Sequence, residues 1–282
     1  MTYRSLLVHL DHDRRFEARL AYALRIARTQ GCHVVGVAPT GAVPLAPEVS
    51  IVTAASLSDY ADAVWMMLDE RAQAAQVRFE EACRKAGLES RKSVVEHADK
   101  AQSLVRHSHC SDIVVLSQAD PEAPNFAAAR ELVAEVVLRS ARPTVVLPFA
   151  GEFDTVASRV LVAWDDSREA ARAIADALPL LRLAERVQVV SWDRSAAGSE
   201  AGWHERHEAL KRWLDAHDVA AELRLTRTGI ALTEALLSRA SDFDADLIVM
   251  GAYGHPRWTE RVLGGMTQGM LASMTVPVLM SH

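Results

Sequence analysis

The chain has 282 residues, of which 50% are hydrophobic and 24% charged, and its formal net charge is −6 at pH 7. This composition is that of an ordinary globular protein, and the acidic charge disfavours a general nucleic-acid partner, which requires a basic face. The three cysteines are scattered and predict no disulfide framework. The first residues read as a strand rather than a signal peptide, and no apolar run is long enough to cross a bilayer. We therefore expect a cytoplasmic protein with no membrane partner.

The first half alternates β-forming and helical patterns. Strands are expected at 5–11, 32–38, 93–96, 112–116 and 143–148, and helices at 16–30, 58–86, 100–107 and 131–139. Ser58 is the expected cap of the long second helix and Gly87 its stop. The proline-rich stretch before that helix, 39–56, is expected to be a loop. Strands alternating with helices predict right-handed crossovers and a parallel sheet.

The same pattern then restarts. Strands are expected at 159–165, 187–192, 221–226, 246–250 and 276–280, and helices from Ser167 to 181 and at 200–217, 231–239 and 266–272. Asp112 and Asp246, which open the two fourth strands, stand 134 positions apart, and so do Pro143 and Pro277. The last third of each half therefore aligns without a gap, which indicates two homologous five-stranded units. We place them at residues 1–150 and 151–282.

A glycine-rich segment lies near the end of the second unit. The apolar run 247–250 predicts a buried parallel strand, and it ends at Gly251 and Gly254. Gly264 and Gly265 then lead into a helix that carries Thr267 in its first turn. The free amide groups and the partial positive charge of a helix N-terminus favour an anion such as a phosphate. This segment predicts a nucleotide-binding site.

The spacing of Gly251, Gly254 and Gly264, the aspartate Asp165 at the end of the first strand of the second unit, and the terminal sequence 275–279 together resemble the universal stress protein family in its tandem form. The resemblance implies an α/β fold of two tandem doubly wound five-stranded parallel-sheet domains, similar to the adenine nucleotide α-hydrolases. Many members of that family bind ATP without a well-defined reaction. Members usually pair through their fifth strands, so a tandem chain is expected to form an intramolecular pseudo-dimer.

The family's adenosine site can be carried over to matching positions of the second unit. Ala163 and Asp165 would flank adenine, while Met250 and Gly251 would lie at the base or ribose. Phosphates would be approached by the backbone of the following residues: Gly254, Gly264, Gly265, Met266 and Thr267. Family members that bind ATP usually carry Ser or Thr where this chain has Gly265, so one hydroxyl contact, about 1 kcal/mol, is missing.

The first unit lacks this pattern. The ungapped alignment places Ser117, Asp120, Arg130 and Glu131 at the positions of the four glycines. Side chains there, two of them acidic, oppose a triphosphate sterically and electrostatically. We therefore predict one nucleotide site per chain, in the second unit.

The sequence favours a binding protein over a catalyst. It contains no nucleophile elbow, zinc-protease motif or P-loop lysine, and we assign no catalytic residue. His107, His109 and Cys110 do not by themselves supply a tetrahedral site, so no metal site is assigned, and His204 and His207 are expected on a solvated helix face. The predicted function is a stress-response protein that binds ATP, AMP or ADP, with or without Mg²⁺, in a regulatory role. Three alternatives stay open: an interaction module that binds no nucleotide, a weak ATPase, and a homodimer of such chains.

Overall fold

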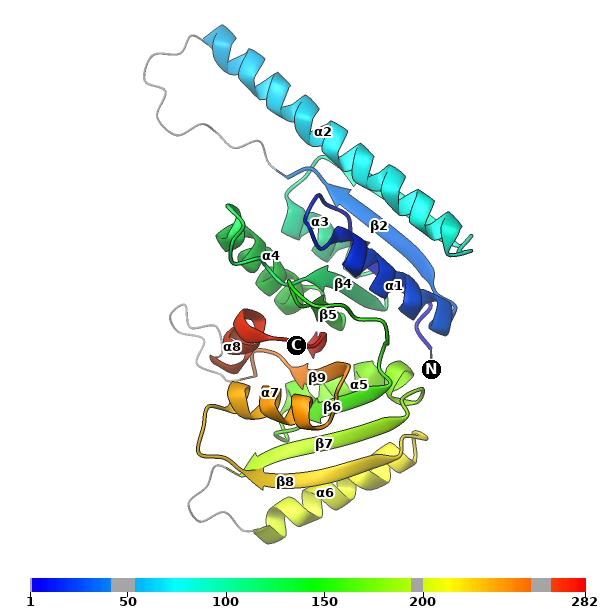
Figure 1. Cartoon of the computed structure of the whole chain (residues 1–282), viewed down its shortest axis with the longest axis vertical. Helices are drawn as coiled ribbons and strands as arrows, with labels where there is room; N and C mark the ends of the chain where they lie inside the picture. The colour runs from blue at the N-terminus through cyan, green and yellow to red at the C-terminus, as the bar shows by residue number, and fades with distance from the viewer. Residues whose placement is uncertain (1, 42–53, 194–199, 255–264) are drawn as a thin grey trace.

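The computed structural model describes residues 2–41, 54–193, 200–254 and 265–282 (Figure 1). Its first unit contains β1 (Ser5–His9), α1 (Phe16–Gln30), β2 (His33–Pro39), α2 (Ala54–Lys85), β3 (Arg91–Glu96), α3 (Lys100–Ser108), β4 (Ile113–Ser117), α4 (Phe126–Arg139) and β5 (Thr144–Leu147). Its second unit contains β6 (Arg159–Ala163), α5 (Arg168–Leu181), β7 (Arg186–Asp193), α6 (Glu200–Asp215), β8 (Ala221–Arg227), α7 (Leu232–Asp242), β9 (Leu247–Gly251), α8 (Gly265–Ser273) and β10 (Val278–Ser281).

All ten of these strands form one sheet, in the order β3-β2-β1-β4-β5-β10-β9-β6-β7-β8. Every neighbouring pair is parallel except β5 and β10, which are antiparallel. Within each unit the order is that of a doubly wound sheet with a switch point between the first and fourth strands. The predicted fold and the predicted pairing of the fifth strands are therefore confirmed.

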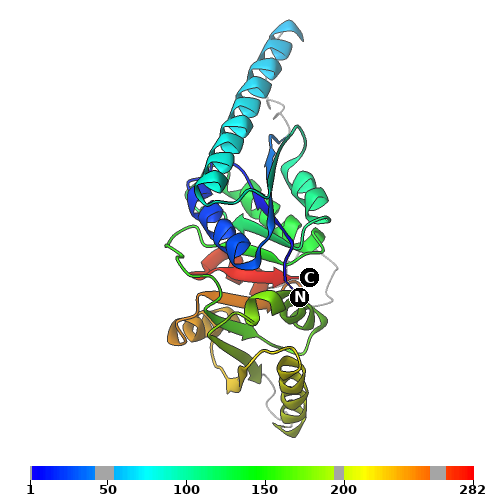
Figure 2. The ribbon, with the colours of Figure 1, turned by 90° about the vertical axis from the view of Figure 1, so that its right-hand side faces the viewer.

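Two hydrophobic layers cover the sheet. One contains buried side chains of α1, α2, α5 and α6, and the other those of α3, α4, α7 and α8. Both layers run across the two units, because the central β5–β10 pair joins them into one sheet (Figures 1 and 2). The strands at the centre are fully buried, as their nearly continuous apolar sequences require.

The two units are related by an approximate twofold axis at the central strand pair. Val145 in β5 pairs with Leu279 in β10, and these residues are 134 positions apart. That separation equals the offset of the sequence repeat, so Val145 faces its own repeat equivalent. The flanking pairs, Val146 with Val278 and Thr144 with Met280, are equivalents of each other, as a twofold axis requires. The repeat that was found in the sequence is thus also the symmetry of the sheet.

Equivalent aspartates fasten the first strand of each unit to the fourth. The carboxylate of Asp112 accepts hydrogen bonds from the amides of Arg4 (2.7 Å) and Ser5 (3.0 Å). Asp246 accepts them in the same way from the amides of Ser158 (2.9 Å) and Arg159 (2.8 Å). The aspartate that opened each fourth-strand pattern in the sequence therefore has a structural role in both units.

Two helices begin four or more residues before the position that the sequence predicts. α2 begins at Ala54, so Ser58 lies inside the helix and is not its cap. α4 begins at Phe126 rather than at 131, because the alanines at 127–129 are strong helix formers that extend it towards the N-terminus. Gly31, by contrast, ends α1 in a left-handed conformation as predicted. Of the helices that the structure describes, none is both long enough and apolar enough to cross a membrane.

Candidate functional site

The predicted site residues come together at the carboxyl ends of two adjacent strands. β6 and β9 are paired through Val162 and Val249, so the end of β6 at Ala163 lies beside the end of β9. Met250 and Ala163 are both buried, and Met250 pairs with Met280 of β10. The start of α8, with Gly265, Met266 and Thr267, follows the loop after β9. Gly264 lies outside the described residues.

Gly251 is required by packing within the chain. A Cβ at this position would come 2.6 Å from the backbone nitrogen of Ala170 and 2.6 Å from the carbonyl carbon of Glu169, both in the first turn of α5. Backbone atoms cannot give way to such a contact, so the end of β9 approaches α5 closely only because residue 251 has no side chain. We expected a side chain here to clash with a base or ribose; the contact that the structure shows is with α5.

A buried carboxylate, which the sequence analysis missed, lies against the glycine loop. The Oε2 atom of Glu169 would be 2.8 Å from a Cβ added at Gly254, and Glu169 forms an ion pair with Arg168 at 2.9 Å. Burial raises the pKa of Glu169, but a hydrogen bond from its own backbone amide and the Arg168 guanidinium outweigh it, so the pKa is lowered. Glu169 is therefore ionised at neutral pH and places a negative charge beside the predicted phosphate positions.

Two residues at the start of α8, Gly265 and Thr267, have different surroundings. A Cβ at Gly265 would meet no atom of the described residues within 4 Å, so none of these residues fills the space beside the helix start. Thr267 is 3% exposed, and its hydroxyl oxygen accepts a hydrogen bond from the amide of Tyr253 (3.1 Å). That hydroxyl connects Tyr253 to the helix, and its own proton has no acceptor within the part of the chain that the structure describes.

Asp165 and Ser167 share the turn that starts α5. The Asp165 carboxylate, which is exposed, accepts a hydrogen bond from the amide of Ser167 (3.1 Å). The Ser167 hydroxyl accepts one from the amide of Ala170 (3.1 Å) and is the N-cap of the helix. The carboxylate of Asp165 thus stabilises a turn, and its second oxygen has no hydrogen bond among those that the described residues form.

The corresponding place in the first unit is filled by side chains of the chain itself. Arg19 of α1 is 1% exposed and lies at the ends of β1 and β4. Its guanidinium donates to Asp11 (2.6 Å), Ser117 (2.8 Å) and the carbonyl of His9 (3.0 Å). Burial raises the pKa of Asp11, but Arg19 and His9 outweigh it and hold the pKa far below its usual range. A permanent internal cation therefore occupies this end of the first unit.

The remaining equivalents of the glycines do not present a helix start. Arg130 and Glu131 lie inside α4, where amide groups are bonded within the helix, as that of Ala129 is to the carbonyl of Asn125 (2.9 Å). Asp120 forms an ion pair with Arg14 at 2.8 Å. Arg130 and Glu131 therefore do not offer an anion the free amides of a helix start.

Two histidines have partners that the sequence analysis did not foresee. His207 is not fully solvated, because its Nε2 lies 2.9 Å from the hydroxyl of Ser191 and its ring stands edge-on to Trp203. His107 lies 3.1 Å from the carboxylate of Glu96. Among the described residues, no three histidine, cysteine, aspartate or glutamate side chains are grouped closely enough to hold a metal ion.

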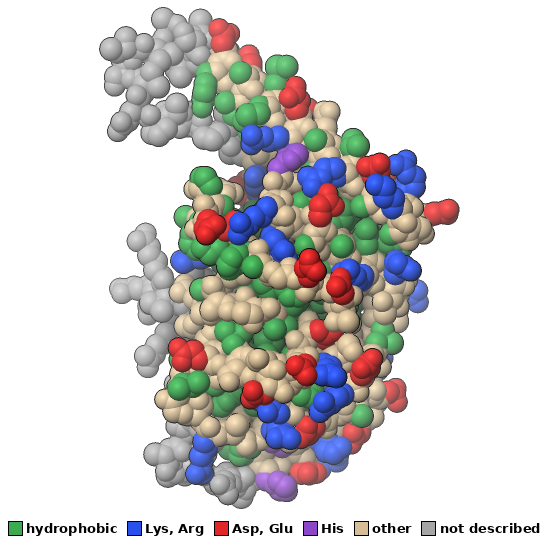
Figure 3. Space-filling view, viewed as in Figure 1, with side chains coloured by type: hydrophobic (Ala, Val, Ile, Leu, Met, Phe, Trp, Pro, Cys, Tyr) green, Lys and Arg blue, Asp and Glu red, His purple; other side chains and the backbone are tan. Residues whose placement is uncertain are grey.

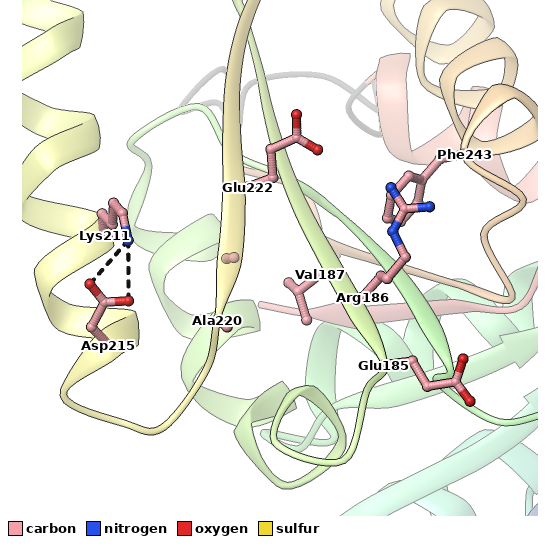
Figure 4. A pocket seen from close by; sticks show the side chains of 9 residues that line it. Glu185, Arg186, Val187, Lys211, Asp215, Ala220, Glu222 and Phe243 are labelled. Carbon is pink, nitrogen blue, oxygen red and sulfur yellow. Dashed lines mark hydrogen bonds and ion pairs between the residues drawn. The ribbon is translucent and has the colours of Figure 1, made fainter.

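A surface hollow of about 350 Å³ lies at the other end of the second unit (Figure 4). Its wall is formed at the amino ends of β7 and β8, where Arg186 stacks over Phe243 at 4.8 Å and Lys211 pairs with Asp215 at 3.1 Å. Of its charged side chains, Lys211 and Asp215 pair with each other, and Glu222 accepts hydrogen bonds from Gln188 and Arg224 outside the hollow. Ligands of open α/β sheets bind at the carboxyl ends instead.

Fold and site together define the class: a tandem, doubly wound α/β protein whose second unit carries a glycine-lined strand end beside an open helix start. Residues 157–282 match the model of the Universal stress protein family. A universal stress protein from Archaeoglobus fulgidus has the same fold, with a TM-score of 0.72, 14% identity, and coverage of 98% of this chain and 97% of that one. Residues 157–282, which form the second unit, thus match the universal stress protein family, and the whole chain has the tandem fold of that structural neighbour.

A protein of unknown function from Pseudomonas aeruginosa is also similar in structure, with a TM-score of 0.58 and 14% identity over 99% of this chain and 92% of the other. Comparison with curated proteins gives no significant match. At these identities the structural likeness establishes the fold alone.

Proposed function

We propose that the second unit binds one adenine nucleotide per chain, ATP in the first place and AMP or ADP as alternatives, and that binding serves regulation rather than catalysis. The observation that carries this proposal is the open space at Gly265, at the start of α8. A helix start with free amides next to the carboxyl ends of parallel strands is a favourable place for phosphate. The matching family assignment of this unit supports a role in the stress response, in the cytoplasm.

The difference between the two units supports a single site. In the second unit, no described side chain fills the space at the start of α8. In the first unit, the buried Arg19 fills the strand ends, and α4 begins so early that Arg130 and Glu131 lie inside it. A nucleotide in the first unit would have to displace a cation that makes hydrogen bonds to three residues, and leaving the partly buried Asp11 without its partner is costly.

The negative charge of Glu169 affects whether the nucleotide binds with or without Mg²⁺. Its ionised carboxylate lies beside Gly254, so it repels a polyphosphate that comes near the loop. A Mg²⁺ ion bound with the polyphosphate reduces that repulsion. We therefore propose that ATP binds as its Mg²⁺ complex, and that AMP depends less on Mg²⁺.

A regulatory role requires that the nucleotide bind two arrangements of the protein with different affinity. The part of the second unit best placed for this is the loop after β9, which Thr267 holds through the amide of Tyr253. A phosphate that accepts a hydrogen bond from the Thr267 hydroxyl would strengthen this connection. No described side chain near Gly265 is placed as a general base, so we propose no turnover beyond that of a weak ATPase.

Calorimetric titration of the full chain with ATP and with AMP, each with and without Mg²⁺, tests the proposal. Gly265→Glu introduces the residue that the first unit has at this position, and we expect it to weaken ATP binding by at least about tenfold, since a carboxylate then faces the phosphates. Gly265→Ala is the matched control and should bind within a few-fold of the wild type, because its Cβ meets open space. A stoichiometry of two, or equal binding by Gly265→Glu and Gly265→Ala, would contradict the proposal.

The alternative is an interaction module that binds no nucleotide. It is favoured by the packing reason for Gly251, which needs no ligand, and by the negative charge of Glu169. Titrations without heat for either nucleotide, together with no thermal stabilisation at millimolar ATP, would establish this alternative.

A further inference from the structure

A histidine that has no role in the site described so far, His282, lies beside the loop after β9. Ser281, the last residue of β10, pairs with Gly251, and the amide of Ala252 donates to the carbonyl of Ser281 (2.8 Å). His282 therefore follows β10 at the point where the neighbouring strand β9 enters its loop. This is the carboxyl edge of the sheet, where ligands of open α/β folds bind.

The ring of His282 contacts this loop directly. Its Nδ1 lies 3.0 Å from the carbonyl oxygen of Ala252, and the ring stands edge-on to Tyr253 with the two centroids 6.3 Å apart. A carbonyl oxygen only accepts hydrogen bonds, so Nδ1 carries a proton and Nε2 is the atom that gains one when the ring becomes charged. The contact with Ala252 is therefore made by the neutral and the charged ring alike, and protonation adds a charge without breaking it.

The charged groups around His282 come from two helices. Burial raises the pKa of Glu169 on α5, but its own amide, Arg168 and His282 act against burial, and the pKa is lowered. Burial also raises the pKa of Tyr253 to about 12, against the charge of Arg130 on α4. The attraction between His282 and Glu169 is mutual, so a charged ring offsets the negative charge that Glu169 places at the loop.

Local charges of this kind decide how an anion is received, because the protein offers no general positive field. The formal net charge of the chain is −6. On the face in Figure 3, Lys and Arg side chains are interspersed with Asp and Glu, without a large patch of one sign. One added positive charge beside the loop therefore changes the local potential in a way that the surroundings do not mask.

We propose that His282 is a positioning residue of the nucleotide site, and that its protonated ring offsets Glu169 and favours ligands that carry phosphate. This inference rests on the proposed nucleotide binding by the second unit. The neutral ring holds the Ala252 carbonyl but supplies no charge. Affinity for a polyphosphate should therefore fall as the pH rises through the range in which histidine loses its proton. Adenosine, which has no phosphate, should not show this effect.

Titration calorimetry of the full chain with Mg²⁺ and ATP, with AMP and with adenosine, at about pH 6 and about pH 8, tests the proposal. The ratio of ATP affinity at the lower pH to that at the higher pH should be at least about threefold larger in the wild type than in His282→Gln, the effect of one nearby charge. Glutamine keeps a donor for the Ala252 carbonyl but cannot be charged. Protonation of the phosphates themselves is the same with both proteins and cancels in this comparison.

His217→Gln is the matched control. The Nδ1 of His217 also lies close to a backbone carbonyl, that of Trp213 (2.7 Å). His217 precedes β8, however, and so lies at the amino ends of the strands, away from the proposed site. This variant should keep the wild-type ratio, and circular dichroism should show unchanged helix content in both variants.

A measurement without ligand tests whether His282 and Glu169 act on each other. In a proton NMR titration, the ring of His282, identified by its absence from His282→Gln, should lose its proton at lower pH in Glu169→Gln than in the wild type. The neutral amide no longer stabilises the charged ring. His217 should titrate alike in both proteins. An unchanged titration of His282 would overturn the proposal.

The calorimetric outcomes separate this inference from the proposed function. A wild type that binds no adenine nucleotide at either pH overturns both. If the wild type and His282→Gln bind ATP with the same ratio between the two pH values, this inference fails while the nucleotide site stands. Equal losses of ATP and adenosine affinity in His282→Gln at both pH values also overturn it, because the ring then only shapes the loop.

Discussion

Two positions of the same motif, 251 and 265, carry glycine for different physical reasons. Gly251 has no room for a side chain because the backbone of α5 lies 2.6 Å from the place of its Cβ, whereas Gly265 has open space there. The first is a condition of folding, and the second leaves room for a ligand. Stability and binding measurements should therefore separate them.

We expect Gly251→Ala to lower the free energy of unfolding by about 1–3 kcal/mol, because the clash is with backbone atoms and must shift α5 or β9. Gly265→Ala should change it by less than about 1 kcal/mol, or raise it, since alanine reduces the entropy of the unfolded chain. Urea unfolding followed by circular dichroism measures both. Equal losses would show that the strand and helix do not approach as closely as described.

The buried cluster around Arg19 makes stability depend on pH. The pKa of His9 is lowered to about 4, chiefly by burial; Asp11 opposes this shift, and Arg19 and Lys100 add to it. Between pH 6.5 and 4 the unfolded chain therefore binds a proton at His9 that the folded chain does not. The stability that the folded protein gains from the neutral His9 is complete above pH 6.5 and is lost as the pH falls towards 4. The lowered pKa of Asp11 adds a loss below about pH 4.

The free energy of unfolding should consequently fall by about 2 kcal/mol from His9 alone between pH 7 and pH 5. In His9→Gln that part of the pH dependence should disappear, while Arg19 still pairs with Asp11. Urea titrations at the two pH values give the comparison. An unchanged pH dependence in His9→Gln would mean that His9 titrates normally in the folded protein.

At the scale of elements, the start of α5 organises the second unit. Ser167 caps this helix, Glu169 in its first turn lies against Gly254, and Ala170 touches the position of Gly251. This one turn thus caps α5, carries the negative charge of Glu169 and packs against the end of β9. Sequence patterns identify the cap, but the other two roles depend on which strand lies beside the helix.

Ser167→Ala should destabilise the protein by about 1 kcal/mol through loss of the cap, and Ser167→Asp should restore most of it. Asp165→Asn keeps a side-chain oxygen for the amide of Ser167 and should cost less than Ser167→Ala. Thermal unfolding measures all three. If Asp165→Asn also weakens ATP binding without a change in stability, the carboxylate itself contacts the ligand; a larger loss of stability than in Ser167→Ala would contradict the cap assignment.

At the scale of the whole molecule, the β5–β10 pair makes one structure of two repeats. Hydrogen bonds from Gln118 to the carbonyl of Leu271 (2.9 Å) and from Gln30 to that of Pro179 (2.9 Å) add contacts between the units away from the strands. Both are buried, so breaking the units apart would leave polar groups unpaired. We expect the units to unfold together rather than in turn.

Calorimetry of the full chain should accordingly show one transition. Leu279→Ala, at the approximate twofold axis, removes a fully buried side chain and should lower the free energy of unfolding by about 2–5 kcal/mol while the transition stays single. Leu225→Ala, at a leucine 38% exposed on the edge strand β8, is the control and should have a much smaller effect. Two separate transitions in the wild type would contradict this view.

The sequence alone determined the class of fold, the repeat and the place of the glycine segment. It could do so because hydrophobic periodicity, glycine and proline positions and a constant offset of 134 are local or arithmetic properties of the chain. It also indicated that the first unit lacks the glycines of a nucleotide site. The stop at Gly31 was readable for the same reason, since a helix stop involves neighbours in the chain.

Only the tertiary structure decided what surrounds those residues. The contact of Gly251 with α5, the carboxylate of Glu169 beneath Gly254 and the filling of the first unit by Arg19 each join residues that are distant in sequence. Such juxtapositions depend on how strands and helices pack, which the local sequence pattern does not encode.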